Sequence, residues 1–156
     1  MLKDAVNIPV FIGHNIFSPE DAEKMLAEGN ADFVALGRSQ LADPAWAKKA
    51  KEGRASDIKP CINCLIGCID RGMLSHTPIH CTVNPSLYRF ECKPVEKAET
   101  RKQVAVVGAG PAGCEAALTA SKRGHQVTIY EKRCIGGAMI EASKPENKAN
   151  IKRLIH

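Results

Sequence analysis

Four of the seven cysteines in this 156-residue chain lie close together in the sequence. Cys61, Cys64 and Cys68 have the spacing Cys-x2-Cys-x3-Cys, and Cys81 follows after twelve intervening residues. This grouping is typical of a 4Fe-4S cluster, because each iron corner of the cubane takes one thiolate. A zinc ribbon usually has two separated Cys-x2-Cys pairs, whereas three of these cysteines lie in one short segment. Zinc is therefore the alternative interpretation and not the preferred one. We predict a 4Fe-4S cluster on Cys61, Cys64, Cys68 and Cys81.

Residues beside these cysteines are suited to turns around an inorganic core. Pro60 precedes the first cysteine, Gly67 precedes the third, and Asn84-Pro85 follow the fourth. The remaining cysteines, Cys92, Cys114 and Cys134, have no ligand spacing, and we interpret them as buried small hydrophobes or inert thiols. An odd cysteine count without a visible export signal argues against a disulfide framework.

A glycine-rich segment indicates a second site, for a dinucleotide. Val104–Val107 reads as a buried strand, and Cys114–Lys122 as a helix whose N-terminus faces a pyrophosphate. Between them lies the turn Gly108-Ala109-Gly110-Pro111-Ala112-Gly113. We expect the first glycine to permit the turn, the second to let phosphate approach, and the third to let helix and strand pack.

The residues after this helix complete the dinucleotide-binding pattern. Val127–Tyr130 is predicted to be the next strand, and Glu131 stands at its end, where a carboxylate accepts hydrogen bonds from a ribose. The same charge would repel a 2′-phosphate, which disfavours NADP at this position. Gly136-Gly137 is interpreted as a loop near the same pocket, or as a turn only.

The N-terminal residues read as a strand, a helix and a second, parallel strand. Residues 8–12 and 31–36 are the predicted strands. Ser18 is a good N-cap for the helix, Asp21 stands at the capping-box position, and Gly29 is placed to end it. Ala22, Met25 and Leu26 are expected to face inward. Another helix is predicted from Asp43-Pro44 to near Gly53.

Each predicted strand is followed by residues that can bind phosphate. Gly13-His14-Asn15 follow the first strand and Gly37-Arg38 the second, at the carboxyl ends of neighbouring parallel strands. Backbone N–H groups and a guanidinium there form a plausible phosphate cradle. Alternatively, Gly37 only ends a strand and Arg38 is a surface charge.

Composition excludes several classes of protein. The chain is 44% hydrophobic and 25% charged, as in globular proteins, and no apolar run approaches the roughly 18 residues of a membrane span. No signal-peptide pattern is visible, so a cytoplasmic location is expected. The net charge of +5 comes from scattered Lys and Arg, so we predict neither nucleic-acid nor membrane binding.

The order of these motifs resembles the iron-sulfur flavoenzymes related to 2,4-dienoyl-CoA reductase, NADH:flavin oxidoreductase (old yellow enzyme-like) and trimethylamine dehydrogenase. The resemblance implies an α/β internal fragment with three parts. Residues 1–55 would be the last two strands and helices of a (β/α)8, or TIM-type, FMN barrel. Residues 56–100 would be the iron-sulfur segment and linker, and residues 101–156 the start of a Rossmann-like FAD/NAD-binding domain.

The resemblance also assigns cofactors to residues. FMN phosphate would be bound by Gly13, His14, Asn15, Gly37 and Arg38, and the cluster by Cys61, Cys64, Cys68 and Cys81. The ADP part of FAD would be bound by Gly108, Ala109, Gly110, Pro111, Ala112, Gly113, Glu131, Gly136 and Gly137. In the family the first turn often has glycine followed by Arg or Gly, whereas here the glycine comes one residue earlier.

The implied activity is oxidoreduction of a small molecule. NAD(P)H would reduce FAD, the cluster would pass electrons singly to FMN, and FMN would reduce an activated C=C bond of the enoate or enoyl-CoA type. No catalytic residue is assigned, since the proton donor would lie outside this chain, and the fragment alone is expected to be inactive. Amine dehydrogenation, the other branch of the family, is one alternative. A non-catalytic electron-transfer or nucleotide-binding module with structural zinc is another.

Overall fold

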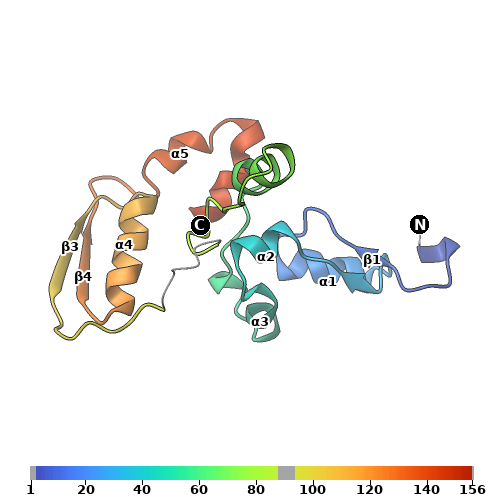
Figure 1. Ribbon diagram of the computed structural model, residues 1–156, viewed down its shortest axis with the longest axis horizontal. Helices are drawn as coiled ribbons and strands as arrows, with labels where there is room; N and C mark the ends of the chain where they lie inside the picture. The colour runs from blue at the N-terminus through green and yellow to red at the C-terminus, as the bar shows by residue number, and fades with distance from the viewer. Residues whose placement is uncertain (1–2, 88–93, 156) are drawn as a thin grey trace. The chain divides into compact units, whose positions relative to one another are not determined.

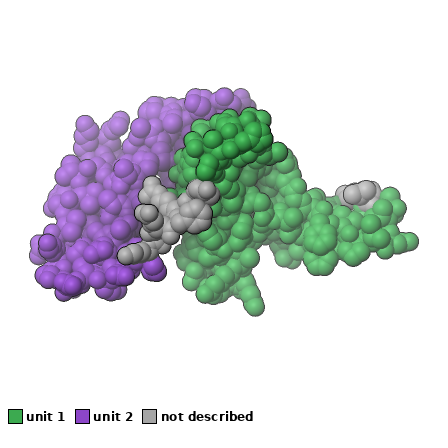
Figure 2. Space-filling model, in the orientation of Figure 1, with its two compact units in different colours: residues 1–89 green, residues 90–156 purple. Residues whose placement is uncertain are grey.

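The computed structural model describes residues 3–87 and 94–155 and divides into two compact units, residues 1–89 and 90–156 (Figures 1 and 2). Each unit has its own two-stranded parallel sheet. The cysteine-rich segment through Cys81 is part of the first unit, and the glycine-rich turn is part of the second. Cys92, for which the sequence predicts an inert or buried thiol, lies outside the described residues.

The first unit contains the strand–helix–strand order that the sequence predicts (Figure 1). Strands β1 (Phe11–Ile12) and β2 (Phe33–Val34) are parallel, with Phe11 beside Phe33, and are joined through helix α1 (Pro19–Ala27). Both strands are shorter than predicted. Hydrogen bonds from Asp32 and Ala35 to the carbonyls of Val10 and Ile12 extend the pairing beyond the regular strands.

Helix α1 begins and ends with side-chain and backbone caps. Ser18 Oγ accepts the Asp21 N–H at 3.0 Å, and the Asp21 carboxylate accepts the Ser18 N–H at 3.3 Å, which confirms the predicted capping box. At the other end, Gly29 and Asn30 donate to the carbonyls of Leu26 and Met25, the pattern of a Schellman cap. The helix therefore ends at the glycine that the sequence indicated.

The prediction that Leu26 faces inward is wrong. Its side chain is 37% exposed, whereas Ala22 and Met25 are partly covered. The helix contacts a sheet only two short strands wide, which is too narrow to cover its whole apolar side. The sheet itself has an exposed aromatic pair, because the rings of Phe11 and Phe33 stack at 4.6 Å while both remain half or more exposed.

Two short helices follow β2. Helix α3 (Trp46–Lys51) ends just before Gly53, as predicted, but helix α2 (Arg38–Ala42) was not predicted. Its N-cap, Gly37, makes no side-chain cap, so no sequence signal marks its start. Ser39 at its buried side donates to the Ile16 carbonyl at 2.5 Å, and this bond holds the turn after β1 against α2.

Asp43 lies between α2 and α3 and is buried. Its carboxylate accepts hydrogen bonds from Lys49 Nζ at 2.6 Å and from the N–H groups of Ala45 and Lys59 at 3.0 and 2.9 Å. Burial by itself raises the pKa of Asp43, but these donors outweigh it and hold the pKa below its ordinary value. Asp43 therefore joins α3 to the chain that enters the cysteine-rich segment.

The cysteine-rich segment contains little regular structure besides one π-helix. A 3-10 turn (Ala55–Asp57) leads into it, and the π-helix covers Ile66–Leu74, with Leu65 at its start in the left-handed region at φ 61°. Helices of this type are rare and are found mostly at functional sites. A further 3-10 turn, Lys3–Ala5, stands before β1.

The second unit contains the second strand–helix–strand sequence. Strands β3 (Gln103–Val107) and β4 (Gln126–Tyr130) are parallel over all five residues, with helix α4 (Pro111–Lys122) between them. Helix α4 begins three residues before the predicted start, because Pro111 has a backbone already suited to the first helical position. Helix α5 (Ala138–Ala142) and a 3-10 helix (Glu146–Leu154) follow.

Within residues 3–87 and 94–155, no helix is long and apolar enough to cross a membrane.

We expect Asp43→Asn to lower the free energy of unfolding by about 3 kcal/mol, because it leaves the mostly buried Lys49 side chain without its anion. Urea unfolding at pH 7 can be followed by the fluorescence of Trp46, the only tryptophan. Trp46 is buried, and its backbone N–H donates to the Asp43 carbonyl. Glu52→Gln is the control, since its ion pairs with Lys48 and Arg54 are exposed and worth less than about 1 kcal/mol. Equal effects of the two variants would contradict this role.

Candidate functional site

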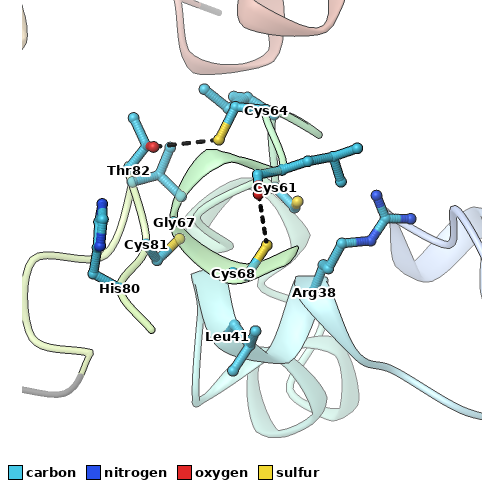
Figure 3. Close-up of a pocket in the computed structure, with 12 residues that line it drawn as sticks. Arg38, Leu41, Cys61, Cys64, Gly67, Cys68, His80, Cys81 and Thr82 are labelled. Atoms are coloured by element: carbon cyan, nitrogen blue, oxygen red, sulfur yellow. Dashed lines mark hydrogen bonds between the residues drawn. The ribbon is translucent and has the colours of Figure 1, made fainter. Parts of the chain in front are cut away.

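The four predicted cluster cysteines line a single cavity in the first unit (Figure 3). Cys61 and Cys64 lie in the loop before the π-helix, Cys68 is in the helix, and Cys81 follows it. Cys61 is buried and the other three are partly exposed. The cavity among them is small, about 20 Å³, and its lining also includes Arg38, Leu41, His80 and Thr82.

Close contact between backbones brings Cys68 and Cys81 to the same cavity. The His80 N–H donates to the Gly67 carbonyl at 2.9 Å, directly beside both cysteines in sequence. A Cβ atom at Gly67 would lie 2.3 Å from the His80 carbonyl oxygen, so only glycine fits there. The glycine before the third cysteine is thus required for the approach of the two segments.

Polar groups that can donate to sulfur lie beside Cys61 and Cys64. The Asn63 N–H donates to Cys61 Sγ at 3.4 Å, and Thr82 Oγ1 lies 3.2 Å from Cys64 Sγ. Burial raises the pKa of the Cys61 thiol, while the Asn63 N–H and the Arg38 guanidinium oppose that shift. Hydrogen bonds to cysteine sulfur stabilise negative charge there, which is how proteins adjust the reduction potentials of clusters.

The spacing of the four thiols in space bears on which metal they could hold. Among the residues that the structure describes, no three His, Cys, Asp or Glu side chains come close enough together to hold one metal ion. Zinc with bonds of about 2.3 Å to sulfur needs the sulfurs roughly 3.8 Å apart. The four thiols line one cavity without converging on a single point.

The predicted phosphate residues also lie together. Gly13, His14, Asn15, Gly37 and Arg38 line a second cavity of about 310 Å³, with Ser39 and Ile69 among its other residues. Arg38 Nη2 donates to Asn15 Oδ1 at 2.8 Å, which joins the turns after the two strands. Arg38 lines the cysteine cavity as well, and Ile69 is the residue after Cys68. The two cavities are therefore neighbours.

The glycine-rich turn of the second unit has the features expected of a pyrophosphate loop. Gly108 has φ 98°, and a Cβ at Gly113 would lie 2.0 Å from the Gly108 carbonyl oxygen, so the turn and α4 pack as only glycines allow. A Cβ at Gly110 would meet no atom within 4 Å, which leaves space above the turn. Ala109 precedes this space, and Pro111 and Ala112 begin α4.

Gly136, Gly137 and Glu131 lie around the same turn. The Gly136 N–H donates to the Ala109 carbonyl at 2.8 Å, and a Cβ at Gly137 would lie 3.0 Å from Gly110 Cα. The Glu131 carboxylate accepts the Ala109 N–H at 2.8 Å and the Arg133 N–H at 2.9 Å, and these bonds hold its pKa below the ordinary value. Glu131 is ionised at neutral pH and fastens the turn to the end of β4.

Sequence reasoning missed several residues of the cysteine site. Asn63 and Thr82 contact ligand sulfurs, and Leu41 of α2 lines the cavity. Polar residues beside cysteines are common in loops, so their type gave no signal. The one sequence signal at Asn63 is its residue type, because asparagine tolerates the left-handed backbone region, in which its φ of 54° lies.

Two family models match the two ends of the chain. Residues 1–57 match the family described as the NADH:flavin oxidoreductase / NADH oxidase family, and residues 102–156 match pyridine nucleotide-disulphide oxidoreductase. An NADH oxidase from Thermoanaerobacter brockii is 51% identical over 153 residues, which cover 97% of this chain and 24% of that protein. The chain belongs to the NADH:flavin oxidoreductase family.

Other members of the NADH:flavin oxidoreductase family represent its two kinds of chemistry. Cinnamate reductase from Clostridium sporogenes is 35% identical over 156 residues, and the match covers 99% of this chain and 23% of that protein. The solved structure of histamine dehydrogenase from Rhizobium sp. 4-9 matches with a TM-score of 0.88 at 31% identity, covering 99% of this chain and 23% of that one. The chain thus spans about a quarter of the length of these oxidoreductases.

Gly67→Ala tests whether the close backbone contact assembles the cysteines. We expect the iron content per chain after anaerobic purification to fall by more than half, since the new Cβ must separate Gly67 from His80. The matched control is Gly72→Ala, whose Cβ would meet only the Ile79 side chain, at 2.7 Å, and a side-chain end can move. Unchanged iron in Gly67→Ala would show that the contact is dispensable.

Proposed function

We propose that this chain is the electron-transfer segment of an NAD(P)H-dependent flavoenzyme that reduces an activated C=C bond in a small molecule. The observation that carries the proposal is the adjacency of the four-cysteine cavity and the phosphate cradle, which have Arg38 in common. Two cofactors that exchange electrons need to lie close together, and this fold puts their candidate sites side by side within one unit.

Each set of residues has a binding role in this proposal. A 4Fe-4S cluster is held by Cys61, Cys64, Cys68 and Cys81. The phosphate cradle, which is formed by residues 13–15 with Gly37 and Arg38, holds the phosphate of FMN. The glycine-rich turn and Glu131 bind the ADP part of FAD or the pyridine nucleotide. When bound, flavins exchange hydride and the cluster exchanges single electrons, so the set can convert one kind of transfer into the other.

The chain's own groups favour the charged forms of these cofactors. The Arg38 guanidinium offers a cation and several N–H donors to a phosphate dianion. In the second unit, α4 begins at Pro111, directly after Gly110, where an added Cβ would meet no atom within 4 Å, and the N-terminus of a helix favours a bound anion. The Glu131 carboxylate there disfavours a 2′-phosphate, which supports NADH over NADPH at this site.

A cytoplasmic location belongs to the same proposal. Thiolates that ligate a cluster must stay reduced, and the cytosol maintains cysteines in that state.

Amine dehydrogenation is the second candidate, because a solved relative with a TM-score of 0.88 is a histamine dehydrogenase. The two reactions move electrons in opposite directions. An alkene reductase draws electrons from NADH and needs a working nucleotide site, whereas an amine dehydrogenase delivers electrons from its substrate to an acceptor. The intact glycine-rich turn with its open space at Gly110 favours the reductase. A zinc-filled, non-catalytic module is the remaining alternative, and it is disfavoured because the chain does not have the two separated Cys-x2-Cys pairs usual in zinc ribbons.

The proposal is tested with the complete flavoenzyme that contains this segment, assayed anaerobically with an enoate. We expect NADH-driven alkene reduction in the wild type, and a loss of at least tenfold in both Cys68→Ala and Gly110→Ala. Gly110→Ala removes no contact, but its methyl group occupies the space over the turn. Both variants should still reduce the alkene when dithionite supplies electrons, because dithionite bypasses the nucleotide and cluster sites.

Two results would contradict this function. One is amine oxidation without any NADH-driven alkene reduction in the wild type. The other is NADH-driven activity in Cys68→Ala equal to that of the wild type, since electrons would then reach the substrate without the cluster.

A further inference from the structure

Asn63 lies between the two candidate sites of the first unit. It stands in the loop between Cys61 and Cys64, and its backbone N–H donates to Cys61 Sγ at 3.4 Å. Its side-chain Oδ1 accepts a hydrogen bond from Arg38 Nη1. One residue therefore contacts a cluster ligand through its backbone and the phosphate arginine through its side chain.

Arg38 makes two such contacts with one planar group. Nη1 reaches Asn63 in the cysteine loop, and Nη2 reaches Asn15 in the phosphate turn at 2.8 Å. The arginine is partly buried and lines both cavities. Because a guanidinium is rigid, a shift of its position at one end is transmitted to the other.

The Arg38 hydrogen bond is made to a residue with an uncommon backbone conformation. Asn63 has φ 54°, a left-handed conformation that is unfavourable for residues other than glycine, although Asn tolerates it better than most. The hydrogen bond from Arg38 stabilises this conformation, which in turn aims the Asn63 N–H at Cys61 Sγ. Without the hydrogen bond to Arg38, the Asn63 side chain would no longer hold the backbone N–H in its direction toward Cys61 Sγ.

Charge at the cysteine sulfurs connects this geometry to redox chemistry. Reduction adds one electron, and thus one negative charge, to a cluster held by thiolates. An N–H donor and a nearby cation stabilise that charge and raise the reduction potential. A phosphate dianion bound to Arg38 offsets its positive charge and competes for its N–H donors, so it has the opposite effect.

We propose that Asn63 is a positioning residue that couples the phosphate cradle to the cluster: Arg38 fixes Asn63, and Asn63 fixes the hydrogen bond to Cys61. The inference rests on the proposed function, since it requires a cluster on the four cysteines and a phosphate at Arg38. The coupling is reciprocal, so phosphate lowers the cluster's potential and reduction weakens phosphate binding by the same factor.

The test uses the complete enzyme with its cluster retained and FMN removed, and inorganic phosphate as the probe. The cluster's midpoint potential is measured from its EPR signal, with and without saturating phosphate. In the wild type we expect saturating phosphate to lower the midpoint potential of the cluster. The shift should correspond to phosphate binding about threefold more tightly to the oxidised enzyme than to the reduced enzyme. The same factor should appear when phosphate binding is measured directly to oxidised and reduced enzyme.

Two variants separate coupling from simple loss of a hydrogen bond. Asn63→Gly keeps the backbone N–H and tolerates positive φ but loses the contact with Arg38, so its potential should fall and its phosphate dependence should shrink by more than half. Thr82→Val removes the hydroxyl beside Cys64, whereas the Arg38 side chain donates to Asn63 and Asn15. Its potential should fall as well, but its phosphate dependence should equal that of the wild type.

The outcomes distinguish the inference from the function beneath it. If the wild type shows no cluster EPR signal, the proposed function fails. If the signal is present but Asn63→Gly has the wild-type potential, or a full phosphate dependence, the assignment of Asn63 is overturned. A loss of phosphate dependence in Thr82→Val would overturn it too, because the effect would then be general loosening of the site.

Discussion

The guanidinium of Arg38 joins the two cavities of the first unit. It stands at the start of α2, directly after the second parallel strand, and binds Asn15 and Asn63 with separate nitrogens. Strand pairing fixes the origin of the side chain, and its planar shape fixes the two partners relative to each other. A lysine has one nitrogen and could not hold both turns with the same geometry.

Helix α2 is the platform on which the cysteine-rich segment is built. Asp43 at its C-terminus binds the chain entering the segment, through Lys59 N–H. Asn84, just after the last cysteine, donates to the Leu41 carbonyl at 2.9 Å, so the chain leaving the segment is attached to the same helix. With both ends fixed, a loop with one π-helix and little other regular structure can still present four thiols to one space.

Local sequence signals predicted much of this fold, and contacts between distant residues account for what they missed. The Ser18 capping box, the glycine helix ends and the turn at Gly108 are decided by neighbouring residues, so their types alone were informative. The four cysteines and the Glu131 position were found by spacing. Helix α2 has five residues and no side-chain cap, so no local pattern predicted it. The hydrogen bond between Arg38 and Asn63 joins residues that are 25 positions apart, so no local pattern predicted it either. Leu26 was misplaced because periodicity shows which side of a helix is apolar, not how much of it a narrow sheet covers.

Metal analysis of anaerobically purified protein tests the central claim, that four thiols around one space hold a cluster. Iron, acid-labile sulfide and zinc are measured together with the visible spectrum. The account predicts about four irons and four sulfides per chain, a brown colour, and no stoichiometric zinc. One zinc per chain in colourless protein would contradict it, and would make the segment from Cys61 to Cys81 a structural link instead of a path for electrons.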